Sequence, residues 1–101
     1  MTGAEPHWEW DPGKDETNRR LHGLSFETAI LVFEDPLAAT LEDPYPYERR
    51  WRTVGMVGRA ILVVVHTWPE RNLDAGEEIG RIISARKATN RERNAYEEGT
   101  C

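Results

Sequence analysis

The sequence predicts a single α+β domain with a small, mostly antiparallel sheet. Its 101 residues are the size of one small domain, and 39% of them are hydrophobic, which is typical of a globular chain. Two helical patterns precede a series of short strand patterns, and the tight turns between the later strands favour antiparallel pairing. The predicted order is β-α-α-β-β-β-β-α in one domain, 1–101, with an ordered core of about 7–98.

The chain is predicted to open with one strand and one polar helix. In "HWEW", Trp8 and Trp10 lie on the same face of an extended segment. Asp11 is a typical N-cap, and the proline after it suits the first helical position. The helix then covers about 12–22 and ends at Gly23, which can adopt the left-handed conformation.

A second helix is predicted after Ser25, its N-cap. "EDP" at 34–36 ends this helix, because a proline cannot continue it. Its apolar residues recur at helical spacing and form a stripe that faces the core: Phe26, Ala29, Ile30 and Phe33.

The second half of the chain is predicted to form the sheet. Strand patterns occupy residues 38–42, 49–57, 60–68 and 79–85. The segment 60–68 is apolar on both faces, which indicates the central strand, and 69–78 is predicted to be a loop. Thr89 and Glu92 have the spacing of a capping box and predict a C-terminal helix.

Positive charge is concentrated near the C-terminus of an acidic chain. The net charge of the whole chain is −5, but the segment from Arg81 to Arg93 contains five basic residues and one acidic residue. Binding of nucleic acid is the commonest reason for such a segment. Arg81 lies within an apolar strand pattern, so it needs an anionic partner, either a carboxylate of this chain or a bound phosphate.

Two further sets of polar residues share a face of a predicted element. Lys14, Asn18 and His22 are spaced four apart on the first helix, where they could bind a phosphate and move a proton. A solvated helix face is the alternative. Glu48, Arg50 and Arg52 alternate on a strand and could clamp phosphates, or could protect a solvated edge strand against aggregation.

Other residue types indicate little chemistry. His66 is interpreted as a structural histidine, and Trp51 and Trp68 as core residues, with base stacking as the alternative. The three histidines are too dispersed for a zinc site without cysteine partners, and the terminal Cys101 is a poor nucleophile, so no metal or cofactor is expected. The longest aliphatic run, "AILVVV", is too short to cross a bilayer and no leader opens the chain, so we expect a cytoplasmic protein without membrane contact.

Four stretches together resemble the BrnT family, the toxin half of a bacterial type II toxin–antitoxin pair. They are "WEWDPGK" from Trp8, "HGLSFETA" from His22, "RW..VG" from Arg50 and "RIISARKAT" from Arg81, and Glu92, Arg93 and Tyr96 follow. The resemblance covers roughly 8–98, and "RIISARKAT" is its most specific part. The chain departs from the family pattern at Leu21, usually a lysine, at Gly80, usually aliphatic, and in its acidity.

The resemblance implies a RelE-like ribonuclease fold and cleavage of RNA that halts translation. It also implies a BrnA-like antitoxin that neutralises the toxin, and we expect a 2:2 complex that binds operator DNA through the antitoxin. The positions that match the polar motif of the family are Lys14, Asn18, His22, Glu48, Arg50, Arg81, Ser84, Arg86 and Tyr96.

The resulting hypothesis is a metal-independent endoribonuclease in which the 2′-hydroxyl of RNA attacks the adjacent phosphate. Arg50, Arg81 and Arg86 would clamp the phosphate, His22 or Glu48 would transfer the proton, and Tyr96 would assist. The expected RNA-binding residues are Lys14, Asn18, Ser84, Lys87, Arg91 and Arg93. The alternative is a catalytically silent binding module whose cationic surface docks an acidic partner.

Overall fold

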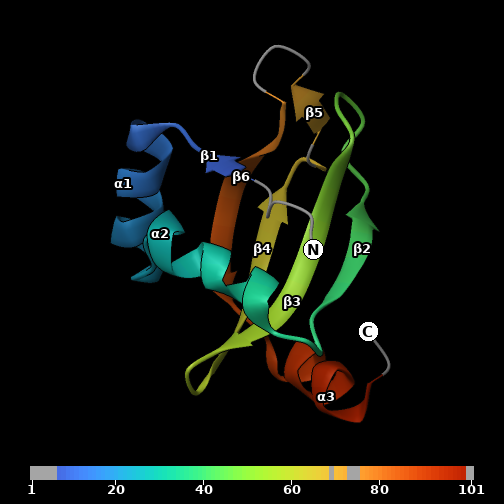
Figure 1. Ribbon diagram of the computed structural model, residues 1–101. Coiled ribbons are helices and arrows are strands. Elements are labelled where there is room, and N and C mark those ends of the chain that lie inside the picture. The colour runs from blue at the N-terminus through green and yellow to red at the C-terminus, as the bar shows by residue number, and fades with distance from the viewer. Residues whose placement is uncertain (1–6, 69, 73–75, 100–101) are drawn as a thin grey trace.

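The computed structural model describes residues 7–68, 70–72 and 76–99. Its element order is β1 (His7–Glu9), α1 (Pro12–His22), α2 (Phe26–Ala29), the 3₁₀ helix η1 (Ile30–Glu34), β2 (Ala39–Asp43), β3 (Arg50–Val57), β4 (Ala60–His66), β5 (Glu70–Asn72), β6 (Glu77–Lys87) and α3 (Asn90–Glu98) (Figure 1). The predicted α+β class is confirmed. Cys101 lies outside the described residues.

The sheet has the strand order β1-β6-β4-β3-β2, and β5 pairs with β6 as well. Only β1 is parallel to its neighbour; the other described pairs are antiparallel, as expected from the tight turns. β4 is central, which confirms the prediction from its two apolar faces, and Ile61 to Val64 are all buried.

The prediction of a loop over 69–78 is wrong at two places. Residues 70–72 form β5, and β6 begins at Glu77, two residues earlier than predicted. The register runs from Glu70 opposite Ile79 to Asn72 opposite Glu77. These residues are mostly polar and show no alternation, so only their backbone pairing reveals the strands.

The second helix is shorter than predicted. α2 has four residues, and the chain then tightens into η1. Three residues per turn bring Val32 under Ala29, and both side chains are fully buried. Phe26 is fully buried, while Ile30 and Phe33 pack against the same core cluster from its edge.

Helices cover the two faces of the sheet unequally. α2 and η1 cover one face, where the main core includes Phe26, Leu62 and Ile82 (Figure 1). The opposite face has a smaller core at one end, where Tyr96 of α3 packs with Val54 and other residues of β3 and β4. On the rest of this second face the polar side chains of Arg50, Arg52 and Ser84 lie together with Val65 and Leu41, and we call it the open face. The predicted helix caps are confirmed at Asp11, Gly23, Ser25 and Thr89 with Glu92.

A β-bulge decides which side chains of β6 reach the open face. Ser84 pairs with Val65, but the next residue of β4, His66, pairs with Ile82. The extra residue on β6 turns Ile82 into the main core and leaves Arg81 and Ser84 on the open side. The bulge therefore places Arg81 and Ser84, which lie on its two sides along β6, on the same face of the sheet.

His66 is a structural histidine, in agreement with the sequence interpretation. It is buried, its Nδ1 donates to the backbone carbonyl of Thr67 at 2.8 Å, and its Nε2 accepts from the hydroxyl of Thr53 at 2.7 Å. Burial lowers the pKa of the imidazole, which keeps it neutral. All helices in the described part of the chain are too short or too polar to span a lipid bilayer.

Candidate functional site

Asn18 joins α1 to the outer edge of β6. Its side-chain nitrogen donates to the backbone carbonyl of Ala85 at 2.8 Å, and its oxygen accepts from the Ala85 amide at 3.1 Å. The same nitrogen also donates to the carbonyl of Leu24 at 3.0 Å, and the residue is only 6% exposed. The amide thus replaces a neighbouring strand at this edge. We therefore assign Asn18 a structural role in place of the predicted RNA-binding role.

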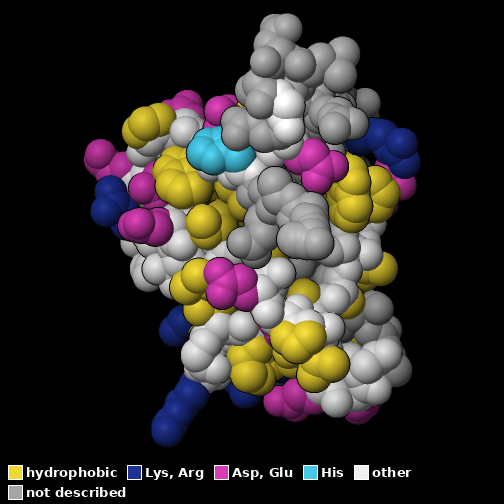
Figure 2. Space-filling view, viewed as in Figure 1, with side chains coloured by type: hydrophobic (Ala, Val, Ile, Leu, Met, Phe, Trp, Pro, Cys, Tyr) yellow, Lys and Arg dark blue, Asp and Glu magenta, His cyan; other side chains and the backbone are white. Residues whose placement is uncertain are grey.

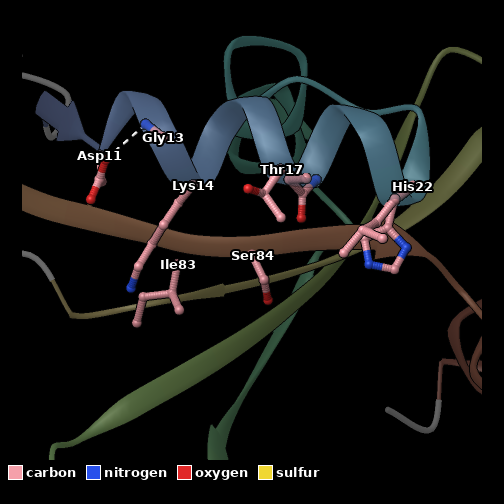
Figure 3. A pocket seen from close by; sticks show the side chains of 9 residues that line it. Asp11, Gly13, Lys14, Thr17, His22, Ile83 and Ser84 are labelled. Carbon is pink, nitrogen blue, oxygen red and sulfur yellow. Dashed lines mark hydrogen bonds between the residues drawn. The ribbon is translucent and has the colours of Figure 1, made fainter.

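A surface pocket of about 380 Å³ lies between α1 and β6. Lys14 and His22 come from α1, and Ser84 comes from β6; Figure 3 shows Lys14 and His22 extending toward the strand from the two ends of the pocket. The three residues predicted to share a helix face, Lys14, Asn18 and His22, all line this pocket. An ammonium, an imidazole and a hydroxyl around one opening can bind a phosphate group.

Glu48, Arg50 and Arg81 form a cluster at the far end of the open face. Nη2 of Arg81 lies 2.7 and 2.9 Å from the two carboxylate oxygens of Glu48, and Nε of Arg50 lies 3.0 Å from one of them. The side chain of Arg81 is 48% exposed, and that of Arg50 is 18% exposed. The anionic partner predicted for Arg81 is therefore a carboxylate of this chain.

The two arginines determine the ionisation of Glu48. Hydrogen bonds from Arg81 and then from Arg50 lower the pKa of its carboxyl group below the usual value. Glu48 is therefore ionised near neutral pH and orients two guanidinium groups. A base with a lowered pKa is a weak base, so this environment suits an orienting residue.

Tyr45 fixes the position of Arg50 from the other side. The guanidinium carbon of Arg50 lies 3.7 Å from the centroid of the Tyr45 ring, a close cation–π contact. Tyr45 was not predicted as a site residue, because "DPYPYE" indicates a turn. The available signal was a tyrosine in the turn that leads into an arginine-rich strand.

Arg52 is the second basic side chain that β3 places on the open face, after Arg50. Its Nε is buried and has no hydrogen-bond partner among the described residues, and it lies 3.6 Å from a carboxylate oxygen of Asp43. A buried donor without a partner is costly.

Arg86 lies in a second cluster, apart from Arg81. Its Nη1 and Nη2 lie 2.7 and 2.9 Å from the two carboxylate oxygens of Glu92, at the start of α3. This pairing raises the pKa of Arg86 and, as its largest cause, lowers that of Glu92 to about 2. Five residues of a strand span roughly 16 Å, so Arg81 and Arg86 do not meet at one phosphate.

Tyr96 anchors α3 to the rest of the domain. Its hydroxyl donates to the carboxylate of Asp35, which also accepts from the backbone amides of Leu37 and Met56. The hydrogen bond from Tyr96 is the main reason why the pKa of Asp35 is lowered. These contacts give Tyr96 a structural role, away from Glu48 and its two arginines.

The remaining predicted RNA-binding residues lie in α3 or just before it. Lys87, Arg91 and Arg93 are exposed, and Arg93 lies 4.0 Å from Glu97. In Figure 2, which views the side covered by α2, Lys and Arg side chains lie toward the margins, and hydrophobic and acidic side chains lie between them. Among residues 7–68, 70–72 and 76–99, no three His, Cys, Asp or Glu side chains are grouped as metal ligands.

The core-packing prediction is wrong for Trp68, which is 55% exposed. Its ring lies 5.1 Å from that of Trp51, which is half-buried. β4 ends at His66, so Trp68 is already beyond the sheet and has no core to enter. The two rings line a pocket with Glu48.

Comparison with known proteins identifies the family of this chain. No curated protein sequence matches the chain. The family model described as "Ribonuclease toxin, BrnT, of type II toxin-antitoxin system" matches residues 10–92. The match runs from the residue before the cap of α1 into the first turn of α3, so it includes Lys14, His22 and both arginine clusters. The chain therefore belongs to the BrnT family of ribonuclease toxins of type II toxin–antitoxin systems.

Proposed function

We propose that this ribonuclease toxin cleaves single-stranded RNA on its open face without a catalytic metal ion. The single observation that carries the proposal is the pairing of both Arg50 and Arg81 with Glu48, through hydrogen bonds to the same carboxylate oxygen. Arg50 and Arg81 come from separate parts of the chain and bring two guanidinium groups together, and the side chain of Arg81 is about half exposed to solvent. Such groups stabilise the charge that develops on a phosphate in the transition state.

The proposed reaction is an internal transfer at phosphorus. The 2′-hydroxyl oxygen forms a bond to the adjacent phosphorus as the bond from phosphorus to the 5′-oxygen breaks. A base accepts the proton of the 2′-hydroxyl, and an acid protonates the departing 5′-oxygen. The products are a 2′,3′-cyclic phosphate and a 5′-hydroxyl, so neither an oxidant nor a reductant is needed.

Arg81 and Arg50 are proposed to bind the phosphate that reacts. Arg81 uses one nitrogen for Glu48, so the rest of its guanidinium edge can donate to phosphate oxygens. Glu48 then acts as the positioning residue for both cations. Tyr45 holds Arg50 at its ring face and keeps that side chain in place.

His22 is proposed as the proton-transfer group, because imidazole is the side chain best suited to this step near neutral pH. It lies in the pocket with Lys14 and Ser84, and Ser84 is three residues from Arg81 along β6. His22 and the cluster around Glu48 lie at different points along β6, so the proposal requires the bound RNA to bring its 2′-hydroxyl to His22 and the adjacent phosphate to Arg81.

Arg86 and the basic residues near α3 are proposed to hold the flanking RNA. Arg86 is committed to Glu92 at both terminal nitrogens, so it would contact a neighbouring phosphate through water or its remaining edge. The exposed side chains of Lys87, Arg91 and Arg93 would contribute salt-dependent attraction.

The family implies an antitoxin partner in addition to the RNA substrate. We propose a 2:2 complex that binds operator DNA through the antitoxin, and action in the cytoplasm, where messenger RNA is available. In this arrangement the antitoxin neutralises the toxin by covering the polar side chains of the open face.

The proposal is tested by primer extension on RNA incubated with the purified chain in the presence of a chelator. We expect cleavage that survives the chelator, and a drop of about 10²–10³ in rate for Arg81→Ala, as for removal of one oxyanion-hole donor. Arg20→Ala is the matched control, because Arg20 pairs with Glu16 on the exposed surface of α1. Cleavage that requires added metal, or that is the same in Arg81→Ala and wild type, contradicts the proposal.

A further inference from the structure

A second pocket, of about 390 Å³, lies at the end of the sheet where β4 ends and β3 begins. It is lined by Glu48, Arg49, Trp51, Thr67 and Trp68. The two indole rings lie 5.1 Å apart with a tilt of 57°. The pocket therefore presents aromatic surface in a chain whose other described tryptophans, Trp8 and Trp10, pack against the main core.

The exposure of Trp68 requires an explanation. An indole ring is the largest apolar side chain, and leaving more than half of it in water forgoes much of the stabilisation that burial provides. Exposed aromatic side chains of this kind are typical of binding sites. A flat ligand could stack against the open part of the ring.

The guanidinium group of Arg49 lies at one side of this aromatic pocket. The guanidinium carbon of Arg49 lies 5.4 Å from the centroid of the Trp51 ring, and its Nε lies 3.3 Å from a carboxylate oxygen of Glu42. Arg49 thus covers one side of Trp51 and leaves Trp68 as the more open ring. A polyanion with aromatic groups would match both features.

The pocket shares Glu48 with the proposed cleavage cluster. Glu48 lines the pocket and accepts hydrogen bonds from Arg81. Thr67 also lines it, and its backbone amide and hydroxyl oxygen bond to the backbone of Arg81, each at 2.9 Å. A ligand in the pocket therefore lies next to Glu48, which the guanidinium groups of Arg81 and Arg50 share.

We propose that the Trp51–Trp68 pocket is a nucleobase-binding subsite. It would stack the base next to the cleaved phosphate against Trp68, in single-stranded RNA. The inference rests on the proposed function for the identity of its substrate and adds how the RNA is seated. Every base has a π-face, so this contact favours unpaired nucleotides over paired ones and tolerates many sequences.

The composition of the pocket favours a base over a peptide. Its lining residues offer two indole faces, a guanidinium, a carboxylate and a hydroxyl, and none of them is an aliphatic residue. A docked protein helix or strand would gain most from aliphatic partners. The combination of stacking surface and cations is typical of proteins that bind single-stranded nucleic acid.

The test measures binding of a fluorescent, single-stranded 2′-O-methyl oligonucleotide, which cannot be cleaved by attack of a 2′-hydroxyl. Trp68→Ala should raise the Kd about 5- to 150-fold, the range for loss of one stacked base, and Trp68→Phe should retain most of the affinity. The same oligonucleotide with abasic sites should bind wild type and Trp68→Ala equally. Leu37→Ala, which removes another exposed apolar side chain, is the control and should leave the Kd unchanged.

Three results would overturn the inference. They are an unchanged Kd in Trp68→Ala, an equal loss of affinity for the abasic oligonucleotide, and weaker binding of the antitoxin without weaker binding of RNA. Because the probe cannot be cleaved, the outcome is independent of catalysis. A chain that cleaves RNA but binds without regard to Trp68 contradicts only this inference, and one that stacks bases on Trp68 but never cleaves contradicts only the proposed function.

Discussion

Glu48 and Arg81, which are 33 positions apart in the sequence, form the shortest described contact of the open-face cluster, at 2.7 Å. The same carboxylate orients Arg50. The arrangement makes Glu48 a positioning residue whose charge aligns two cations. This role and the role of a general base lead to different results on substitution.

Glu48→Gln should lower the cleavage rate by about tenfold, because one charged hydrogen bond to each guanidinium weakens while the acceptor remains. Loss of a general base would cost roughly 10²–10⁴. The pH dependence of kcat/KM should be unchanged in Glu48→Gln and altered in His22→Ala. A disappearance of the acidic limb of the profile in Glu48→Gln would instead make Glu48 the base.

Local sequence patterns predicted a large part of the fold. The caps at Asp11 and Thr89, the apolar run of β4 and the shared face of Lys14 and His22 depend on residues within one element. Fixed helical and strand periods are sufficient to place such residues. The strand β5 was missed, because its pairing with β6 leaves no periodic signal.

The composition of the candidate site could be predicted only in part. The chain brings Arg50 and Arg81 together as expected, but it separates Arg86. Which carboxylate pairs with which arginine depends on strand register and on the bulge opposite His66, and neither is visible in residue spacing. The stacking of Tyr45 on Arg50 joins residues five positions apart, but it depends on the path of the turn before β3, which residue spacing does not show.

The ion pair between Arg86 and Glu92 should make stability depend on pH in the acid range. The folded-state pKa of Glu92 is about 2, against an ordinary value of 4.5, so the unfolded chain binds the proton more readily. The stabilisation is complete above pH 4.5 and decreases as the pH falls toward 2. We expect Glu92→Gln to lower the free energy of unfolding by roughly 1–3 kcal/mol near neutral pH.

Urea denaturation of wild type and Glu92→Gln at a series of pH values measures this effect. The difference between the two proteins should shrink progressively below pH 4.5. Glu97→Gln is the control, because Glu97 is more exposed and lies 4.0 Å from Arg93. A difference for Glu92→Gln that stays constant down to the acid limit would show that the ion pair does not cause it.

Asn18→Ala should destabilise the fold by about 2–4 kcal/mol. The substitution removes three hydrogen bonds and leaves the backbone groups of Ala85 and the carbonyl of Leu24 without partners at the edge of β6. Asn94→Ala, on the exposed surface of α3, should change the free energy of unfolding by no more than about 0.5 kcal/mol. Equal effects of the two substitutions in chemical denaturation would contradict the structural role of Asn18.

Tyr96→Phe separates a structural role from a catalytic one. It removes only the hydroxyl that donates to Asp35, so we expect a loss of about 1 kcal/mol in stability. The cleavage rate per folded molecule should equal that of wild type. A drop of roughly tenfold or more in kcat, measured at a temperature where both proteins are fully folded, would restore Tyr96 to the catalytic residues.

The position of Gly80 has no room for a side chain, because the ring of Trp8 occupies the space that a Cβ would need. A Cβ built on Gly80 would meet the ring of Trp8 at 2.4 Å, and this ring is stacked on Phe33 with centroids 4.2 Å apart. Gly80→Ala must therefore displace Trp8 and should cost about 1–3 kcal/mol. In a Trp8→Leu background the ring is absent, so the same substitution should cost much less. A double-mutant cycle by thermal denaturation measures this coupling, and additive effects would mean that the ring does not explain the glycine.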